Sequence, residues 1–352
     1  MSIKPVSGPH VIAVRRVDEI MGLVIIALVP ATAWGLLLFG FPALYLCSAT
    51  IGSALLFEAM CLKMKGVEAA PFLRDRSAIL TGLLVAMTLP PWAPWWIGVA
   101  GSAIAIVLGK QVYGGLGQNL FNPAMLARVA LLISFPIEMT TWVNVNPLFF
   151  GPGPIDSLAI TFGNAGADAV TGATTLGAVK TGFSNHLTLP GSLSDYNGFL
   201  SFIGWERGSF GETSSLLVLG GGLWLLYKRV IQWHGPVALL ASIALLSTVF
   251  HWIDSSHYLG PWAHLNSGAI MLLAFFIATD YVTSPNTPAG QMLFGAGCGI
   301  LIFIIRTWGG YPEGSGFAIL LMNATTPLID HYVRPRIYGR YRNGRPIDIS
   351  QS

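Results

Sequence analysis

The chain has 352 residues, of which 53% are apolar and only 10% are charged, with a formal net charge of +3. Soluble domains carry about 25% charged residues, so this composition excludes an ordinary soluble protein. The modest net charge gives no indication of nucleic-acid binding. The 11 tryptophans lie mostly near the ends of apolar runs, as is typical of side chains at a membrane–water interface. The sequence therefore predicts an all-α membrane protein.

A helix needs roughly 20 apolar residues to cross a bilayer core. The polar first 18 residues, with Arg15 and Arg16, lead directly into the first long apolar run, which predicts a true span and no cleaved signal peptide. The third run is short and closed by Pro90 and Pro91, which is typical of a half-helix or a tight hairpin. In chain order, the ten candidate spans are 20–39, 43–62, 77–91, 93–112, 123–142, 213–231, 235–253, 265–283, 290–307 and 316–333.

Basic residues are distributed unevenly between the connecting segments. With a cytoplasmic amino terminus, fifteen of the 19 fall in cytoplasmic segments, and the exceptions are Arg128, Lys180, Arg207 and Arg306. The positive-inside rule then predicts that both termini are cytoplasmic and that the one long loop is extracytoplasmic. The expected divisions are a cytoplasmic segment 1–19, a first five-helix group 20–142, the extracytoplasmic loop 143–212, a second five-helix group 213–333 and a basic cytoplasmic tail 334–352.

Two short matches indicate an internal repeat. Lys110-Gln-Val-Tyr-Gly-Gly115 resembles Arg306-Thr-Trp-Gly-Gly310 at an offset of 196 residues, and Ser77-Ala-Ile-Leu-Thr-Gly resembles Ser267-Gly-Ala-Ile-Met-Leu at an offset of 190. An odd number of helices in each repeat gives the two copies opposite orientations in the membrane. The matches therefore predict two inverted five-helix repeats, an architecture that places broken helices and ligand sites near the midplane.

The segment Asp168-Ala-Val-Thr-Gly-Ala-Thr174 in the long loop combines a carboxylate with a small, hydroxyl-rich turn. Gly172 and Ala173 keep the backbone accessible, so that an enzyme can approach the hydroxyl of Thr174 closely. The same residue types also form helix N-caps and loop turns. On local chemistry alone, that plainer interpretation is favoured.

The segment matches the pattern Asp-x-x-Ser/Thr-Gly-Ala-Thr, which marks proteins to which a flavin transferase joins FMN through a phosphoester. Almost the whole chain resembles the D subunits of Rnf electron transport complexes, which are relatives of the B subunits of the sodium-pumping NADH:quinone oxidoreductase. Besides the flavin motif, the strings that carry this resemblance are Ser77-Ala-Ile-Leu-Thr-Gly-Leu-Leu84, Pro90-Pro-Trp-Ala-Pro-Trp-Trp96, Tyr113-Gly-Gly-Leu-Gly-Gln-Asn119, Phe121-Asn-Pro-Ala124, Leu131-Leu-Ile-Ser-Phe-Pro136, Gly309-Gly-Tyr-Pro312 and Tyr332-Val-Arg-Pro-Arg-Ile-Tyr338.

The resemblance implies that Thr174 carries the covalent FMN, with Thr175 as the alternative acceptor. It implies a bacterial inner-membrane subunit without activity of its own, in a complex with another flavoprotein and iron–sulfur subunits. Such complexes exchange electrons between NADH and ferredoxin-type carriers and move Na⁺ or H⁺. Noncovalent riboflavin is a second cofactor associated with the family. The residues that the flavin transferase would recognise are Asp168, Thr171, Gly172 and Ala173.

Other motifs have plainer interpretations. Asn122 is expected to cap a helix that begins at Pro123, and a contact of Asn119 or Asn122 with a flavin ring is a weaker alternative. The string Asn266-Ser-Gly-Ala-Ile270 has Ile at the acceptor position, so it predicts no second phosphoester. We expect its small residues to lie in a helix, where they allow close helix contact or line a cofactor pocket.

Ionisable residues at membrane depth are candidates for an ion path, foremost Glu58 and Asp280, because their burial is costly. Arg128 belongs to the same group, and for all three a helix-end residue that pairs with a neighbour is the favoured alternative. Lys110 and Arg306 are expected to anchor helix ends at the interface, and contact with a flavin phosphate or a lipid is the weaker alternative. The three cysteines and seven histidines form no ligand cluster, and no metal site or catalytic residue is predicted.

Two rival functions remain open at this point. An inverted five-plus-five arrangement is also similar to urea transporters, so a small-solute channel without redox chemistry is the main alternative. A structural membrane scaffold is the other. The flavin motif separates the redox function from both, because neither rival needs it.

Overall fold

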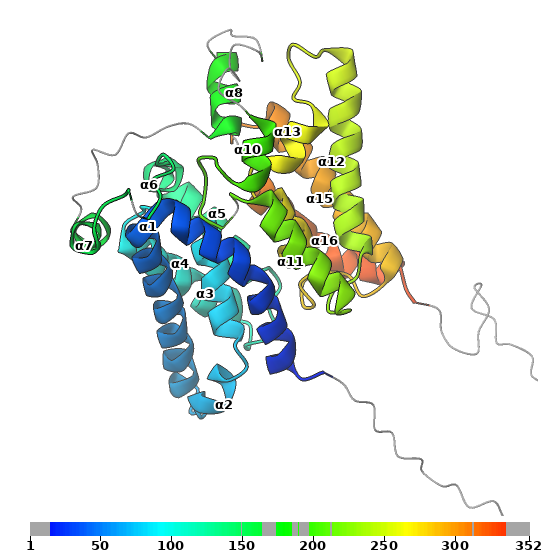
Figure 1. Ribbon diagram of the computed structural model, residues 1–352. Helices are drawn as coiled ribbons and strands as arrows, with labels where there is room; N and C mark the ends of the chain where they lie inside the picture. Colours follow the sequence, from blue (N-terminus) through cyan, green and yellow to red (C-terminus); the bar gives the residue numbers. More distant parts are fainter. Residues whose placement is uncertain are drawn as a thin grey trace, which may run out of the picture.

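The computed structural model describes residues 15–148, 150–163, 174–184, 189, 197–211, 213–311 and 313–335. Within these ranges the regular elements are helices, and no β-strand is present, as the composition predicts. The helices of the first half and those of the second half form two adjoining groups (Figure 1). Of the short helices in the intervening loop, α8 (Thr175–Ser184) and α10 (Gly198–Ile203) lie beside the second group, whereas α7 (Pro154–Phe162) lies beside the first.

The first helix, α1 (Val17–Met64), contains a sharp bend at Gly40. Gly40 has φ 75° and ψ −159°, a conformation that favours glycine, and Pro42 follows it within the same helix. The two arms meet at an acute angle (Figure 1), so the predicted spans 20–39 and 43–62 are these arms. The bend leaves helix carbonyls without partners, and the backbone N–H of Asn146 donates to that of Leu38 at 3.0 Å.

The remaining helices of the first half follow the predicted spans, with one interruption. The span 123–142 is split where Pro136 follows Phe135, because proline has no N–H to continue the helix. Asn122 caps the first part as predicted, its side chain accepting from the N–H groups of Ala124 and Met125. These helices are α2 (Ala69–Leu73), α3 (Ser77–Thr88), α4 (Trp95–Ala103) continuing into the π-helix η1 (Ile104–Gln111), α5 (Pro123–Ser134) and α6 (Pro136–Thr140).

The long loop contains short helices, of which the structure describes α7 (Pro154–Phe162), α8 (Thr175–Ser184) and α10 (Gly198–Ile203). The second half contains four longer helices close to their predicted positions. They are α11 (Ser215–Tyr227), α12 (His234–Ile253), α15 (Pro288–Trp308) and α16 (Ser315–Tyr332).

The predicted continuous helix over 265–283 is wrong. The chain there forms α13 (Pro261–Asn266), a non-helical turn, α14 (Ile270–Leu272) and the π-helix η2 (Leu273–Ile277). The turn contains Gly268 at φ 71°, a left-handed conformation that a helix does not contain. Ser267, Gly268 and Ala269 therefore present backbone groups to their neighbours.

The surface is as apolar as expected of a protein that crosses a membrane several times. Among the described residues, α1, α12 and α15 are long and apolar enough to span a bilayer. Large apolar side chains point outward from these helices, including Leu56 at 72% exposure and Trp252 at 88%. In water such a surface would cause aggregation, whereas in a bilayer it contacts the lipid chains.

Candidate functional site

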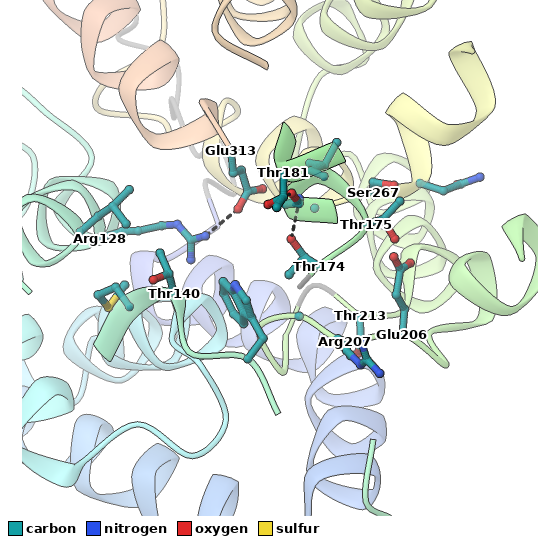
Figure 2. Close-up of a pocket in the computed structure, with 18 residues that line it drawn as sticks. Arg128, Thr140, Thr174, Thr175, Thr181, Glu206, Arg207, Thr213, Ser267 and Glu313 are labelled. Carbon is teal, nitrogen blue, oxygen red and sulfur yellow. Dashed lines mark hydrogen bonds and ion pairs between the residues drawn. The ribbon is translucent and has the colours of Figure 1, made fainter. Parts of the chain in front are cut away.

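A cavity of about 200 Å³ lies where the first half, the long loop and the second half meet (Figure 2). Thr174 is on its wall. Its polar and charged lining residues include Arg128 from α5, Thr174 and Thr175 at the start of α8, Glu206 from the loop, Ser267 from the turn after α13, and Glu313 from the segment between α15 and α16.

Thr174 is the residue directly before α8. Its Oγ1 accepts a hydrogen bond from the N–H of Gly177 at 3.2 Å, and its carbonyl accepts from the N–H of Ala178 at 2.7 Å. Thr174 thus makes the contacts of a helix N-cap, the plainer role considered from the sequence. The amino end of a helix carries partial positive charge, which favours a phosphate group there. Asp168, Thr171, Gly172 and Ala173 lie outside the described residues.

Lys180 fixes α8 to the second half of the molecule. Its ammonium group donates to carbonyl oxygens at the carboxyl end of α15 and just beyond, those of Ile305 at 3.4 Å, Gly309, and Tyr311 at 2.6 Å. Positive charge is favourable at this end of a helix. Burial lowers the pKa of Lys180. The position of Thr174 therefore depends on a contact that spans more than 120 residues of sequence.

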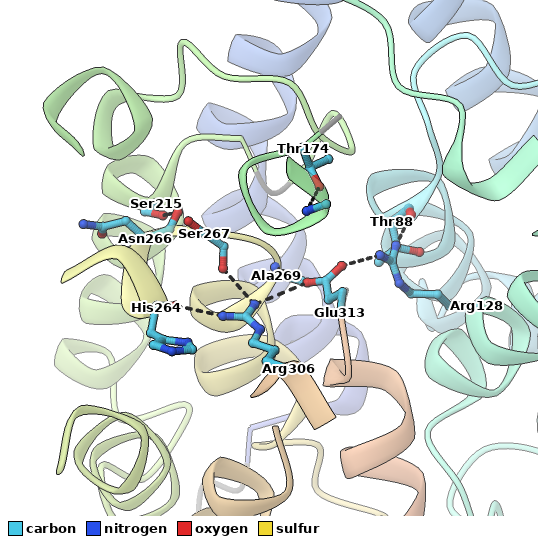
Figure 3. Close-up of polar contacts among 11 residues, drawn as sticks. Thr88, Arg128, Thr174, Ser215, His264, Asn266, Ser267, Ala269, Arg306 and Glu313 are labelled. Atoms are coloured by element: carbon cyan, nitrogen blue, oxygen red, sulfur yellow. Dashed lines mark hydrogen bonds and ion pairs between the residues drawn. The ribbon is translucent and has the colours of Figure 1, made fainter. Parts of the chain in front are cut away.

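Two arginines and one glutamate form a largely buried cluster beside the cavity, with Arg128 and Glu313 on its wall and Arg306 behind them (Figure 3). Arg128 Nη2 lies 2.6 Å from Glu313 Oε2, and Arg306 Nη2 lies 3.8 Å from Glu313 Oε1. Arg128 also donates to the carbonyl of Thr88, at the end of α3. We call these three residues the Arg128–Glu313–Arg306 cluster. It joins α5 of the first half to α15 of the second.

The two arginines favour the ionised form of Glu313. Burial alone would raise its pKa, but the charges of Arg128 and Arg306 outweigh that effect and hold the pKa below its ordinary value. The N–H of Ala269 donates to Glu313 Oε1 at 2.6 Å and adds to the effect. Gly268 permits this approach, since a Cβ there would lie 2.5 Å from Glu313 Oε1.

The turn that contains Ser267 lines the cavity, as one of the two sequence interpretations predicts. Arg306 donates to the carbonyl of His264 at 2.9 Å and to that of Ser267 at 2.8 Å. These carbonyls are available because the helix ends at Asn266. The expected helical position of Ser267 and Gly268 is wrong for the same reason.

Sequence reasoning missed Glu206 and Glu313. Burial raises the pKa of Glu206, which lies close to Thr175 on the cavity wall. Glu313 directly follows the string Gly309-Gly-Tyr-Pro312, and an acidic residue beside a specific string was the available signal. Neither acid lies in a predicted span, so the search for costly membrane charges passed over both.

The membrane-embedded candidates meet other partners. Glu58 Oε1 lies 2.9 Å from Lys110 Nζ and accepts from Gln111 at 2.7 Å. Asp280 accepts from Asn122 at 3.5 Å and from the hydroxyl of Thr283 at 3.1 Å. Both acids thus have polar neighbours within the fold.

Contrary to the expectation from the sequence, Lys110 and Arg306 do not present their side chains to an interface. They are only 2% and 5% exposed, because each forms an ion pair within the fold. A second cavity of about 90 Å³ brings Lys110 and Asp280 together with Asn119 and Asn122.

Comparison with known proteins identifies the family of the chain. Residues 5–339 match the model of the NQR2, RnfD, RnfE family. The chain is 51% identical to the D subunit of the ion-translocating oxidoreductase complex of Halorhodospira halophila, over 98% of each protein. It is 51% identical to the protein of the same name in Stutzerimonas stutzeri, over 94% of each, and 42% identical to one from Escherichia coli (strain SMS-3-5 / SECEC), over 98% of this chain and 100% of the relative. The chain belongs to the NQR2, RnfD, RnfE family.

Proposed function

We propose that the chain is the D-type subunit of an ion-translocating oxidoreductase complex and carries FMN as a phosphoester on Thr174. Its relatives bear the name of that subunit. The observation that carries the cofactor assignment is the position of Thr174. The last residue of the flavin motif lies on the wall of a cavity, at the amino end of a helix. Thr175 lines the same cavity and is the alternative acceptor.

The residues present fit a tethered flavin. The start of α8 favours the phosphate, and the cavity between the two halves offers room beside it for the ring. A flavin exchanges electrons, while the protein determines its orientation and electrostatic surroundings. Lys180 holds the attachment helix in place through the carbonyls after α15. The phosphoester prevents loss of the cofactor, which matters on a side of the membrane without a flavin pool.

In-gel fluorescence tests the attachment. The full-length chain is produced beside a flavin transferase, denatured and examined for retained flavin. We expect signal from the native sequence and from Thr175→Ala, none from Thr174→Ala, and intact mass greater by one FMN in the fluorescent proteins. Signal that survives Thr174→Ala but not Thr175→Ala moves the ester to Thr175. A native protein that weighs no more than its amino acids refutes the proposal.

We further propose that the flavin loop is extracytoplasmic and both termini are cytoplasmic, in a bacterial inner membrane. The distribution of Lys and Arg supports this orientation. Cysteine labelling tests it, since Cys47, Cys61 and Cys298 are buried. An impermeant thiol reagent added to intact cells should label Phe199→Cys in α10 and not Phe72→Cys in α2, both exposed positions. The reverse pattern would place the loop in the cytoplasm.

The second cavity supports a noncovalent riboflavin. Asn119 and Asn122 offer amide groups, and Phe275 and Phe276 line the same space with aromatic rings. A few placed polar groups in an apolar cavity are typical of small-molecule sites. Flavin released by denaturing the Thr174→Ala protein should be riboflavin, and Asn119→Leu should reduce it. No released flavin would exclude this cofactor.

The repeat architecture is part of the proposal, and two contacts between corresponding residues support it, one to a hydroxyl and one to a carbonyl. Lys110 donates to the hydroxyl of Ser77 at 2.8 Å, and Arg306 donates to the carbonyl of Ser267 at 2.8 Å. The sequence repeat pairs Lys110 with Arg306 and Ser77 with Ser267 independently of these contacts. Two inverted five-helix repeats would produce such a correspondence.

In the complex, the chain would relay electrons between partner subunits, including another flavoprotein and iron–sulfur proteins, and this transfer would be coupled to Na⁺ or H⁺ movement. The candidates for an ion path are Glu58, which is buried, and the half-buried Asp280, because both lie within the membrane region. A solute channel or a scaffold remains the alternative. Both predict that Thr174→Ala leaves electron transfer by the assembled complex unchanged, whereas the redox function predicts its loss.

A further inference from the structure

Charged side chains line the cavity at Thr174. Among the residues that the structure describes, the ionisable lining residues are Arg128, Glu206, Arg207 and Glu313, and Arg306 stands directly behind Glu313. Within the Arg128–Glu313–Arg306 cluster, two guanidinium groups face the carboxylate of Glu313. The three side chains are 1% to 15% exposed, so water screens their charges weakly.

The positions of the two arginines differ. Arg128 lines the cavity itself, whereas Arg306 lies behind the turn at Ser267 and lines a neighbouring cavity. Glu313 separates them and divides its oxygens, with Oε2 toward Arg128 and Oε1 toward Arg306 and the N–H of Ala269. The group that meets an occupant of the cavity is therefore the guanidinium of Arg128, with the carboxylate of Glu313 beside it.

Reduction adds negative charge to a flavin, and nearby protein charge tunes how readily it is reduced. Resting on the function proposed above, we propose that the Arg128–Glu313–Arg306 cluster sets the reduction potential of the flavin tethered to Thr174. Arg128 favours the reduced flavin, and Glu313 limits that bias. The cluster also connects α5 to α15, so a purely structural role is the competing interpretation.

The electrostatic role and the structural role predict different signs for the shifts in the flavin's reduction potential. Arg128→Gln and Glu313→Gln both break the same ion pair. If the cluster has a structural role, both variants should therefore shift the reduction potential of the flavin in the same direction. If the role is electrostatic, the two variants should shift the reduction potential in opposite directions. Arg128→Gln removes a positive charge and disfavours the reduced flavin, whereas Glu313→Gln removes a negative charge and favours it.

The experiment is a potentiometric titration of the purified full-length chain with covalent flavin, with dithionite as reductant and a dye of known potential as reference. We expect Arg128→Gln to lower the equilibrium constant for flavin reduction about tenfold, which is about 59 mV for one electron. Glu313→Gln should raise this constant by about the same factor. Arg128→Lys keeps the charge and should stay within about twofold of the native value. Arg74→Gln, the same change at an exposed cytoplasmic-end position, is the matched control.

The outcomes separate the two proposals. Retained flavin with both shifts in one direction, or with neither shifted, overturns the tuning role and leaves the cluster a structural link. Should Arg128→Gln fail to accumulate, Glu313→Gln alone decides, because an unchanged or lower potential overturns the role. A native chain without covalent flavin, made beside a competent transferase, refutes the proposed function, and the tuning role with it.

Discussion

Gly268 lies against the carboxylate of Glu313 so closely that a Cβ at Gly268 would be 2.5 Å from Oε1. The same Cβ would be 2.6 Å from Nη2 of Arg306. With φ at 71°, the backbone conformation also favours glycine. The break in the helix after Asn266 and the ion cluster at the cavity are thus one structural feature.

Replacing this glycine should destabilise the protein. Gly268→Ala would introduce a left-handed alanine, at a cost of about 1–3 kcal/mol, and would push apart Glu313 and Arg306. The thermal unfolding temperature in detergent should fall. Gly220→Ala is the control, since Gly220 lies in α11 with nothing within 4 Å of its Cβ position, and alanine favours helix there. Equal effects of the two changes would contradict this assignment.

The ion pair between Glu58 and Lys110 gives a second prediction. Lys110→Met would leave the Glu58 carboxylate buried without its cation, which in known cases costs roughly 3–5 kcal/mol. The double variant Glu58→Gln with Lys110→Met should recover part of that loss, because no buried charge remains. A double-mutant cycle of unfolding temperatures measures the coupling. Additive losses would show that the two residues act separately.

Lys180 should determine how firmly the attachment helix is held. Lys180→Met would leave the carbonyls of Gly309 and Tyr311 without this donor, at a cost of about 1–3 kcal/mol. We expect thermolysin to cleave near α8 faster than in the native chain, whereas Lys180→Arg, which retains donors, should resist cleavage better than Lys180→Met. Unchanged cleavage in Lys180→Met would mean that other contacts hold the helix.

Glu206 should make stability depend on pH. Burial raises its pKa in the folded state above its ordinary value of 4.5, so the folded protein holds its proton more tightly than the unfolded chain does. The sign follows from linkage: the contribution of Glu206 to stability is fully present below pH 4.5 and is lost as the pH rises from there through the folded-state pKa. Glu206→Gln should remove this part of the decline. The measurement is the unfolding temperature across that pH range, in a Thr174→Ala background to exclude the flavin phosphate. If Glu206→Gln leaves the slope of unfolding temperature against pH unaltered, the assignment is wrong.

The sequence by itself determined the membrane class, the approximate positions of most long helices and the position of Thr174 within the flavin motif. These properties depend on local order along the chain. A run of apolar residues must be helical in lipid, because its backbone hydrogen bonds have no other partners. The cap at Asn122 and the bend between the arms of α1 at Gly40 are local in the same sense.

Only the tertiary structure decided which charges meet. Arg128 and Glu313 lie 185 residues apart in sequence, and no periodic pattern connects them. Gly268 breaks a run that is apolar enough to be predicted as one helix, and the freed carbonyls then receive Arg306. Buried charges and unpaired backbone groups are stable only when distant segments supply their partners. Such pairing is a property of the folded chain in three dimensions, and for this reason the cavity beside Thr174 could not be inferred from the motif.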